Sequence, residues 1–177
     1  MTISVIGLNH KSANIDVREK FSFSAENASL LLRRIKKIKD ISEVIVVSTC
    51  NRTEIYCDSN NGVNDIKDWL LAEREYESFG KYLYIHQEED AIEHLFKVVA
   101  GLDSMVIGET EVLGQVKTAY KIALENKSID GKLKRLFEYS FSVAKNVRTN
   151  TDIGGNAISF MYTSILLIKK IFSTVEE

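Results

Sequence analysis

The order of hydrophobic patterns in the first half of the chain is the feature that most constrains its fold. Strand-like apolar segments lie at residues 3–8, 44–47, 53–57 and 82–86, and helix-like segments lie at 25–37 and 63–72. Strand, helix, two strands, helix and strand in this order is the βαββαβ pattern of a ferredoxin-like sheet. We therefore predict an α/β (α+β) fold with an antiparallel ferredoxin-like sheet in residues 1–87.

The second half of the chain has a helical period. From Glu88 onward, apolar residues recur every three or four positions, which predicts a helical subdomain over residues 88–155. The segment from Asn156 to Phe172 is apolar around most of its circumference, so we expect a long C-terminal helix that packs against another surface. Its most apolar part, residues 157–168, is shorter than the ~20 residues of a membrane helix, and we expect no membrane partner.

Charge and cysteine content narrow the class of protein. The chain has 177 residues, a formal net charge of −2 and two cysteines, which is typical of a cytoplasmic protein in a reducing compartment. Positive charge is concentrated at Arg33–Lys39 and again from Lys132 to Arg148. Each cluster is either a solvated helix face or a footprint for nucleic acid, because such binding depends on local charge.

Cys50 lies where two predicted strands turn, within the polar segment Ser48–Glu54. A nucleophilic cysteine reacts as its thiolate, which a nearby cation such as Arg52 favours. From these residues alone, an unreactive cysteine in an ordinary loop is the favoured interpretation, and a nucleophile is the alternative. Cys57 differs, because it alternates with Thr53 and Ile55 on one strand face, and we expect it to be buried and inert.

Other polar residues allow two interpretations each. His94 borders an apolar helical stripe, so it is either a hydrogen-bonded residue at the edge of the core or a catalytic group. Glu111 and Gln115 share one helix face, which is either an ordinary helix start or a pocket wall. The cysteines and histidines lack the spacing of zinc ligands, and no G-x-G-x-x-G loop predicts a dinucleotide site.

Several ordered motifs together resemble the glutamyl-tRNA reductase family. They are Gly7–Lys11, Ser48–Glu54, His94–Phe96, Gly101–Ser104, Gly108–Glu109, Leu113–Lys117, Ser142–Lys145 and Val147–Thr149. The resemblance implies an NADPH-dependent oxidoreductase of tetrapyrrole biosynthesis. Its thiolate, here Cys50, attacks the ester of glutamyl-tRNA, and NADPH reduces the resulting thioester to glutamate-1-semialdehyde.

The resemblance also implies roles for individual residues. Cys50 and His94 are expected to be catalytic. The residues expected to bind substrate are Thr49, Asn51, Arg52, Ser104, Glu109, Thr110, Glu111 and Gln115. Arg52 is expected to clamp the glutamyl carboxylate, and Glu109 to hold its ammonium group. Many family members have Glu-Pro-Gln where this chain has Glu109-Thr110-Glu111. The family's substrate-binding role therefore applies less directly to Thr110 and Glu111 than to the other residues.

The family pattern continues into a nucleotide-binding domain and a dimerisation domain. We therefore expect residues 1–155 to form the catalytic domain and residues 156–177 to begin the helix that connects it to the rest of a homodimeric enzyme. On this view the chain binds no NADPH itself and is limited to acyl transfer or esterase activity. The alternative is a non-catalytic RNA-binding or regulatory module that stacks bases on Tyr56, Tyr82 and Tyr84.

Overall fold

A computed structural model describes residues 2–60, 63–73 and 77–154, together with residues 165, 167, 168 and 170. Its elements, in chain order, are β1 (Thr2–Asn9), α1 (Ile15–Phe21), α2 (Ala25–Ile35), β2 (Ile41–Ser48), β3 (Arg52–Ser59), α3 (Asn64–Glu73), the 3-10 helix η1 (Glu77–Tyr82), β4 (Tyr84–Gln87), α4 (Glu88–Ala100), α5 (Glu111–Glu125), α6 (Lys132–Asn150) and the 3-10 helix η2 (Asp152–Gly154).

The four strands form one antiparallel sheet in the order β2-β3-β1-β4. This is the strand order of the ferredoxin-like fold, so the predicted fold class is confirmed. The sheet forms because β2 and β3 make a tight hairpin, with Ser48 opposite Thr53, and β1 pairs on the other side of β3, with Leu8 opposite Thr53. Helix α1 was not predicted, because its seven residues are too few to show a helical period.

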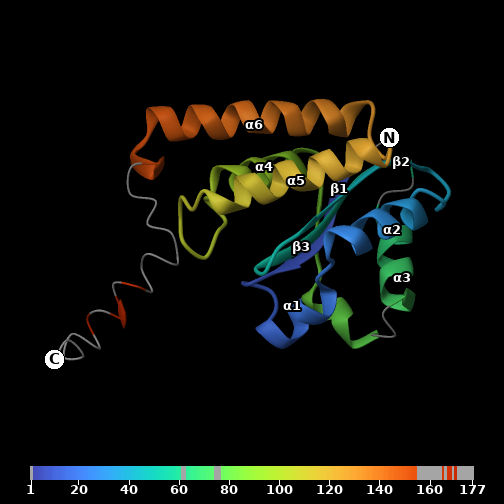
Figure 1. Cartoon of the computed structure of the whole chain (residues 1–177). Coiled ribbons are helices and arrows are strands. Elements are labelled where there is room, and N and C mark those ends of the chain that lie inside the picture. Colours follow the sequence, from blue (N-terminus) through green and yellow to red (C-terminus); the bar gives the residue numbers. More distant parts are fainter. Residues whose placement is uncertain are drawn as a thin grey trace.

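Helices cover both faces of the sheet (Figure 1). α2 and α3 lie on one side and α4 and α6 on the other, while α5 runs along the edge strand β2 and also contacts α2. All eight residues of β3 are buried. Tyr56 points toward α6, where its ring meets Phe137 edge-on at 5.2 Å between centroids.

Cys57 lies on the buried strand β3, as the alternation predicted, with no exposed surface. Burial, together with the charge of Asp58, raises the pKa of its thiol to about 12. The prediction of a buried residue at this position is confirmed.

The start of α6 is anchored to the sheet by a buried carboxylate. Glu43 on β2 accepts hydrogen bonds from the backbone N–H groups of Asp130, Gly131 and Leu133 at 2.8, 2.7 and 2.9 Å. These are donors that a helix N-terminus leaves without partners inside the helix. Burial opposes the charge of Glu43, but these hydrogen bonds outweigh it and hold its pKa below the ordinary value.

The predicted C-terminal helix from Asn156 to Phe172 lies outside the described residues, except for Ile165, Leu167, Ile168 and Lys170, which are helical and exposed. Within the described ranges, no helix is both long and apolar enough to cross a membrane.

Candidate active site

A three-residue turn, Thr49–Asn51, joins β2 to β3 and carries the exposed thiol of Cys50. The Thr49 hydroxyl oxygen accepts the backbone N–H groups of Asn51 and Arg52 at 3.2 and 3.1 Å. The Thr49 N–H donates to the Arg52 carbonyl at 2.8 Å, and the His10 N–H donates to the Asn51 carbonyl at 3.0 Å. The turn is therefore held on both sides while the thiol stays open to solvent.

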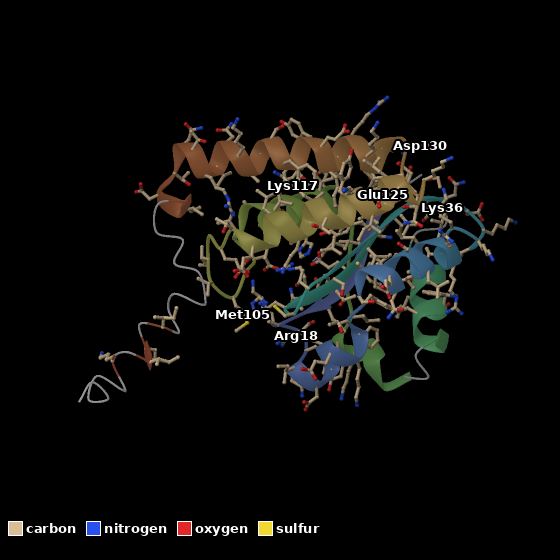
Figure 2. The ribbon with its side chains drawn as sticks, in the orientation of Figure 1. Arg18, Lys36, Met105, Lys117, Glu125 and Asp130 are labelled. Carbon is tan, nitrogen blue, oxygen red and sulfur yellow. The ribbon has the colours of Figure 1, made fainter. Side chains whose placement is uncertain are left out.

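Helix α1 supplies a further support that the sequence did not predict. Arg18 Nε donates to the carbonyl of Cys50 at 3.3 Å, and its Nη1 donates to the carbonyl of Ala13 at 2.8 Å. Figure 2 shows Arg18 at the same end of the molecule as Met105, in the loop between α4 and α5. A single arginine in a helix too short to be recognised has no pattern that could have identified it.

Two hollows adjoin beside the Cys50 turn. The first, of about 260 Å³, is lined by Ile15, Arg18, Glu19, Ser22, Phe23, Ser48, Thr49 and Cys50. The second, of about 150 Å³, shares Phe23 and Ser48 with the first and is also lined by Gln115 of α5. The fold thus brings three predicted site residues, Thr49, Cys50 and Gln115, to one continuous region of the surface.

Arg52 is not placed as a clamp for an incoming carboxylate. Its side chain is 1% exposed, and Nη1 donates to Glu54 Oε1 at 2.8 Å. Nη2 donates to Asp103, to the backbone carbonyl at 2.5 Å and to Oδ2 at 3.1 Å. Arg52 therefore ties the Cys50 hairpin to the α4–α5 loop, and contact with a substrate would require it to exchange one of these partners.

Glu54 is the centre of a buried polar cluster. Its Oε1 accepts hydrogen bonds from Arg52 and from the Tyr84 hydroxyl at 2.6 Å, while Oε2 accepts from the Tyr56 hydroxyl at 2.7 Å. His94 Nε2 lies 2.8 Å from Oε1. Burial opposes the charge of Glu54, but the Arg52 guanidinium outweighs it and keeps the pKa of Glu54 far below the ordinary value.

His94 faces a different cavity from Cys50. This cavity, of about 280 Å³, is lined by Asn9, Lys11, Ser12, Tyr84, His86, His94 and Asp103. The ring of His94 lies 4.9 Å from that of His86. The two predicted catalytic residues therefore line separate cavities, which are linked through Arg52, Glu54 and Asp103.

The α4–α5 loop contributes a buried hydroxyl without a hydrogen-bond partner. Ser104 is 7% exposed, and its Oγ finds no partner among the described residues; the same holds for His10 Nδ1 and Arg52 Nε. Buried polar atoms in native proteins are nearly always paired. Unpaired atoms on three residues around the Cys50 turn are therefore suited to a bound ligand or water.

The remaining predicted residues fall into two groups. Glu109 is buried, and its backbone carbonyl accepts a hydrogen bond from Arg148 Nη2 at 2.8 Å. Thr110 and Glu111 are exposed at the start of α5, and the Thr110 side chain makes no capping hydrogen bond. The structure does not bring these two into the Cys50 hollows.

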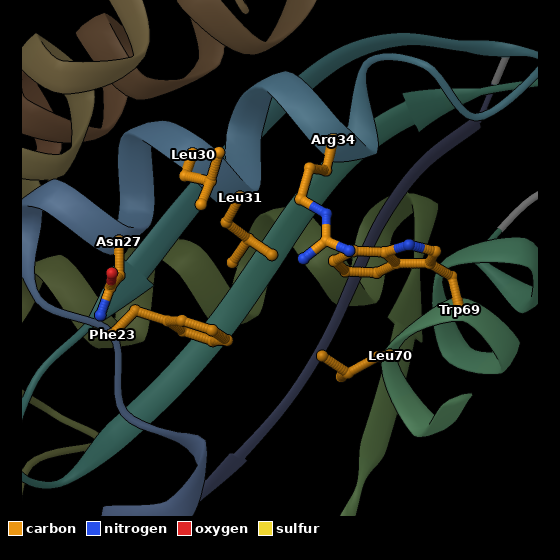
Figure 3. A pocket seen from close by; sticks show the side chains of 7 residues that line it. All are labelled: Phe23, Asn27, Leu30, Leu31, Arg34, Trp69 and Leu70. Carbon is orange, nitrogen blue, oxygen red and sulfur yellow. The ribbon is translucent and has the colours of Figure 1, made fainter. Parts of the chain in front are cut away.

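A groove between α2 and α3 lies apart from these residues (Figure 3). It encloses about 230 Å³ and is lined by Phe23, Asn27, Leu30, Leu31, Arg34, Trp69 and Leu70. The Arg34 guanidinium lies over the Trp69 ring, 5.8 Å from its centroid. None of the described residues that line this groove is a cysteine, histidine or carboxylate.

Comparison with known proteins decides the family. The sequence pattern described as "Glutamyl-tRNAGlu reductase, N-terminal domain" matches residues 6–151. The chain belongs to the glutamyl-tRNA reductase family. Its resemblance to that family, drawn above from separate motifs, is thereby confirmed.

Relatives extend the match along the whole chain. The glutamyl-tRNA reductase of Aliivibrio fischeri is 43% identical over 181 residues, which cover all of this chain and 43% of that protein. That of Photobacterium profundum is 43% identical over 180 residues, with the same coverage. The chain thus spans less than half the length of these glutamyl-tRNA reductases.

A solved structure supports the fold. The glutamyl-tRNA reductase of Methanopyrus kandleri matches 95% of this chain and 39% of that chain, with a TM-score of 0.74 and 27% sequence identity. The ferredoxin-like sheet and its helices are therefore an architecture that this chain shares with another glutamyl-tRNA reductase.

Proposed function

We propose that this chain is the catalytic domain of a glutamyl-tRNA reductase, in which Cys50 accepts the glutamyl group of glutamyl-tRNA. The observation that carries this proposal is the exposed Cys50 thiol, held on a rigid turn beside a hollow of about 260 Å³. A binding module has no need of such a thiol, whereas acyl transfer requires one.

The transfer has a simple balance of bonds. The Cys50 thiolate attacks the ester carbonyl carbon of the glutamyl group, a C–S bond forms, and the C–O bond to the terminal ribose breaks. The ribose oxygen takes up a proton, and the glutamyl group remains on the protein as a thioester. Thr49 and Arg18 keep the turn in place by the hydrogen bonds already described.

Substrate contacts follow from the residues near the turn. Asn51 neighbours Cys50 in the turn, Gln115 lines the adjoining hollow, and Ser104 Oγ in the α4–α5 loop has no partner among the described residues. Glu109 is proposed to bind the ammonium group of the substrate. Thr110 and Glu111 contact the substrate only if the start of α5 approaches it. Arg52 serves chiefly to fix the hairpin, and His94 acts from its own cavity through Glu54.

Reduction by NADPH to glutamate-1-semialdehyde belongs to the proposal for the whole protein. Here we propose no dinucleotide site among the described residues. The sequence lacks the glycine loop that holds a pyrophosphate. We assign no residue of this chain to NADPH.

The domain limits and assembly are part of the same proposal. Residues 1–155 form the catalytic unit, residues 156–177 begin a connecting helix, and the whole protein is a cytoplasmic homodimer. Without a hydride donor, the thioester on Cys50 is lost to water, and the chain acts as a slow glutamyl-tRNA esterase.

The alternative, an RNA-binding module that stacks bases on tyrosines, has less support. Tyr56 is fully buried, and both Tyr56 and Tyr84 donate their hydroxyl groups to Glu54. Tyr56 is therefore inaccessible to bases, and the hydroxyl group of the half-buried Tyr84 is engaged by Glu54.

The test uses tRNA charged with radiolabelled glutamate. The chain is mixed with this tRNA, quenched in acid and checked for label on the protein, with Cys50→Ser as the test variant and Cys57→Ser as the control. We expect a label on wild type and on Cys57→Ser that hydroxylamine releases, and no thioester on Cys50→Ser. An equal thioester label on Cys50→Ser would refute the proposal.

A further inference from the structure

Two clusters of positive charge, about 100 residues apart in the sequence, come together at one end of the molecule. The end of α2 lies against the end of α5, because Arg33 Nε donates to Asn126 Oδ1 at 3.3 Å and Asn126 Nδ2 donates to Ser29 Oγ at 3.1 Å. Figure 2 shows Lys36 and Asp130 at this same end.

The start of α6 joins the same end through the sheet. Glu43 binds the first backbone N–H groups of α6, and Lys132 Nζ lies 3.7 Å from Asp58 Oδ1 near the end of β3. Lys36 Nζ donates to the Ser42 carbonyl at 2.5 Å at the start of β2. The loop after α2 and the first turn of α6 are thus fixed to neighbouring strand ends.

We call this surface the basic end. It comprises seven exposed side chains, Arg33, Lys36, Lys37, Lys39, Lys127, Lys132 and Arg135. The acidic groups nearby neutralise it only in part. Asp40 lies half-buried beside Lys39, and Asp58 is buried and faces Lys132. Glu43 is buried, Glu125 lies 3.8 Å from Lys121, and Asp130 is exposed. A chain with a net charge of −2 therefore presents one surface with an excess of positive charge.

Not every basic residue of the second cluster belongs to this surface. Lys145 lies 13 residues after Lys132 on α6, or about 20 Å along a helix with a rise of 1.5 Å per residue. Arg148 is engaged with the Glu109 carbonyl at the other end. The cluster that looked continuous in the sequence is divided by the length of the helix.

The basic end and Cys50 lie at opposite ends of β2. This strand has eight residues, which at about 3.3 Å per residue gives a separation of about 25 Å. We propose that the basic end binds the phosphate backbone in the duplex arm of the same tRNA whose acylated 3′ end reaches Cys50. This inference rests on the proposed function, because it takes the tRNA as substrate.

The chemistry of the surface favours duplex over single-stranded RNA. Exposed lysines and arginines bind phosphates and position a duplex without reading its sequence, whereas single strands are held by aromatic side chains on which bases stack. None of the seven residues is aromatic. The ring of Trp69 on the neighbouring α3 already has the Arg34 guanidinium over one face (Figure 3). A duplex arm also spans the separation from Cys50, which a terminal nucleotide alone does not.

The test measures how binding depends on salt. Uncharged tRNA specific for glutamate is titrated with wild type, with Lys37→Glu/Arg135→Glu, which takes one residue from each cluster, and with the control Lys121→Glu/Lys145→Glu. All four side chains are exposed. If each residue of the test pair meets one duplex phosphate, the magnitude of the slope of log K against log salt falls by about 1.8 and affinity near 0.1 M salt drops by more than about tenfold.

Two outcomes decide the proposal. It is supported if the test pair shows this loss while the control keeps the wild-type slope. It is overturned if the test pair binds tRNA with unchanged affinity and slope, or if the control loses as much. A small activated glutamyl ester carries no phosphates, so its reaction with Cys50 tests the proposed function separately. If this ester fails to acylate Cys50 in wild type, the result counts against acyl transfer. The tRNA titration still decides whether the basic end binds tRNA.

Discussion

His94 Nε2 and Glu54 Oε1 lie 2.8 Å apart, although 40 residues separate them in the chain. Because the low pKa of Glu54 keeps its carboxylate ionised, Nε2 is the ring nitrogen that carries the proton and donates. Nδ1 is then the nitrogen that Glu54 does not engage. A histidine ring oriented by a buried carboxylate is a common feature of catalytic sites.

Removing the charge of Glu54 should destabilise the fold. In Glu54→Gln, Arg52 keeps its buried charge but loses its fully buried anionic partner, and breaking such a pair costs roughly 3–5 kcal/mol. Tyr84→Phe serves as the matched control, because it removes one hydrogen bond to the same carboxylate and should cost about 1 kcal/mol. Urea denaturation measures both. Equal losses in the two variants would contradict the central role of Glu54.

The anchor of α6 should depend on pH. The folded-state pKa of Glu43 lies below its ordinary value of 4.5, so its contribution is complete above that value and is lost as the pH falls through the folded pKa. Glu43→Ala should lower the free energy of unfolding by about 2–3 kcal/mol at neutral pH, and by less in acid. Glu125→Ala, at an exposed position, should have almost no effect. Thermal unfolding between neutral and acidic pH checks this, and a pH-independent loss would show that the carboxylate charge is not responsible.

The two cysteines should react very differently. Cys50 is exposed, whereas Cys57 is buried with a pKa raised to about 12, so iodoacetamide at neutral pH should label Cys50 alone in the folded chain. Denaturation in urea should make both cysteines reactive. Mass spectrometry of the labelled peptides provides the measurement, and comparable labelling of Cys57 in the folded state would mean that β3 opens readily.

Two glycines flanking the proposed site should respond with opposite signs to alanine. Gly108 has a φ of +84°, and a Cβ there would lie 2.5 Å from the Ile153 carbonyl oxygen, so Gly108→Ala should destabilise by more than about 1 kcal/mol. Gly114 lies within α5 with nothing within 4 Å of its added Cβ, and Gly114→Ala should stabilise by up to about 1 kcal/mol. Melting temperatures decide the question, and a shift of the same sign in both would be inconsistent with this backbone geometry.

Arg52 shows where sequence reasoning reached its limit. The family resemblance implies that it clamps the substrate carboxylate, and the structure adds that its side chain is bound to Glu54 and Asp103. Glu54 follows Arg52 by two residues and therefore lies on the same face of the strand. The sequence could have suggested that these two residues pair. The contact with Asp103, which is 51 residues away, depends on how α4 packs over β1.

The sequence by itself determined the ferredoxin-like order of strands, the exposed turn at Cys50, the burial of Cys57 and the family, because hydrophobic periods and short motifs are local properties. Only the tertiary structure decided that His94 faces a separate cavity, that Arg18 holds the Cys50 carbonyl, and that Arg33 and Lys132 belong to one surface. These relationships depend on which helix ends meet when the core is packed. No local pattern encodes such contacts, since they are selected by the burial of apolar surface across the whole chain.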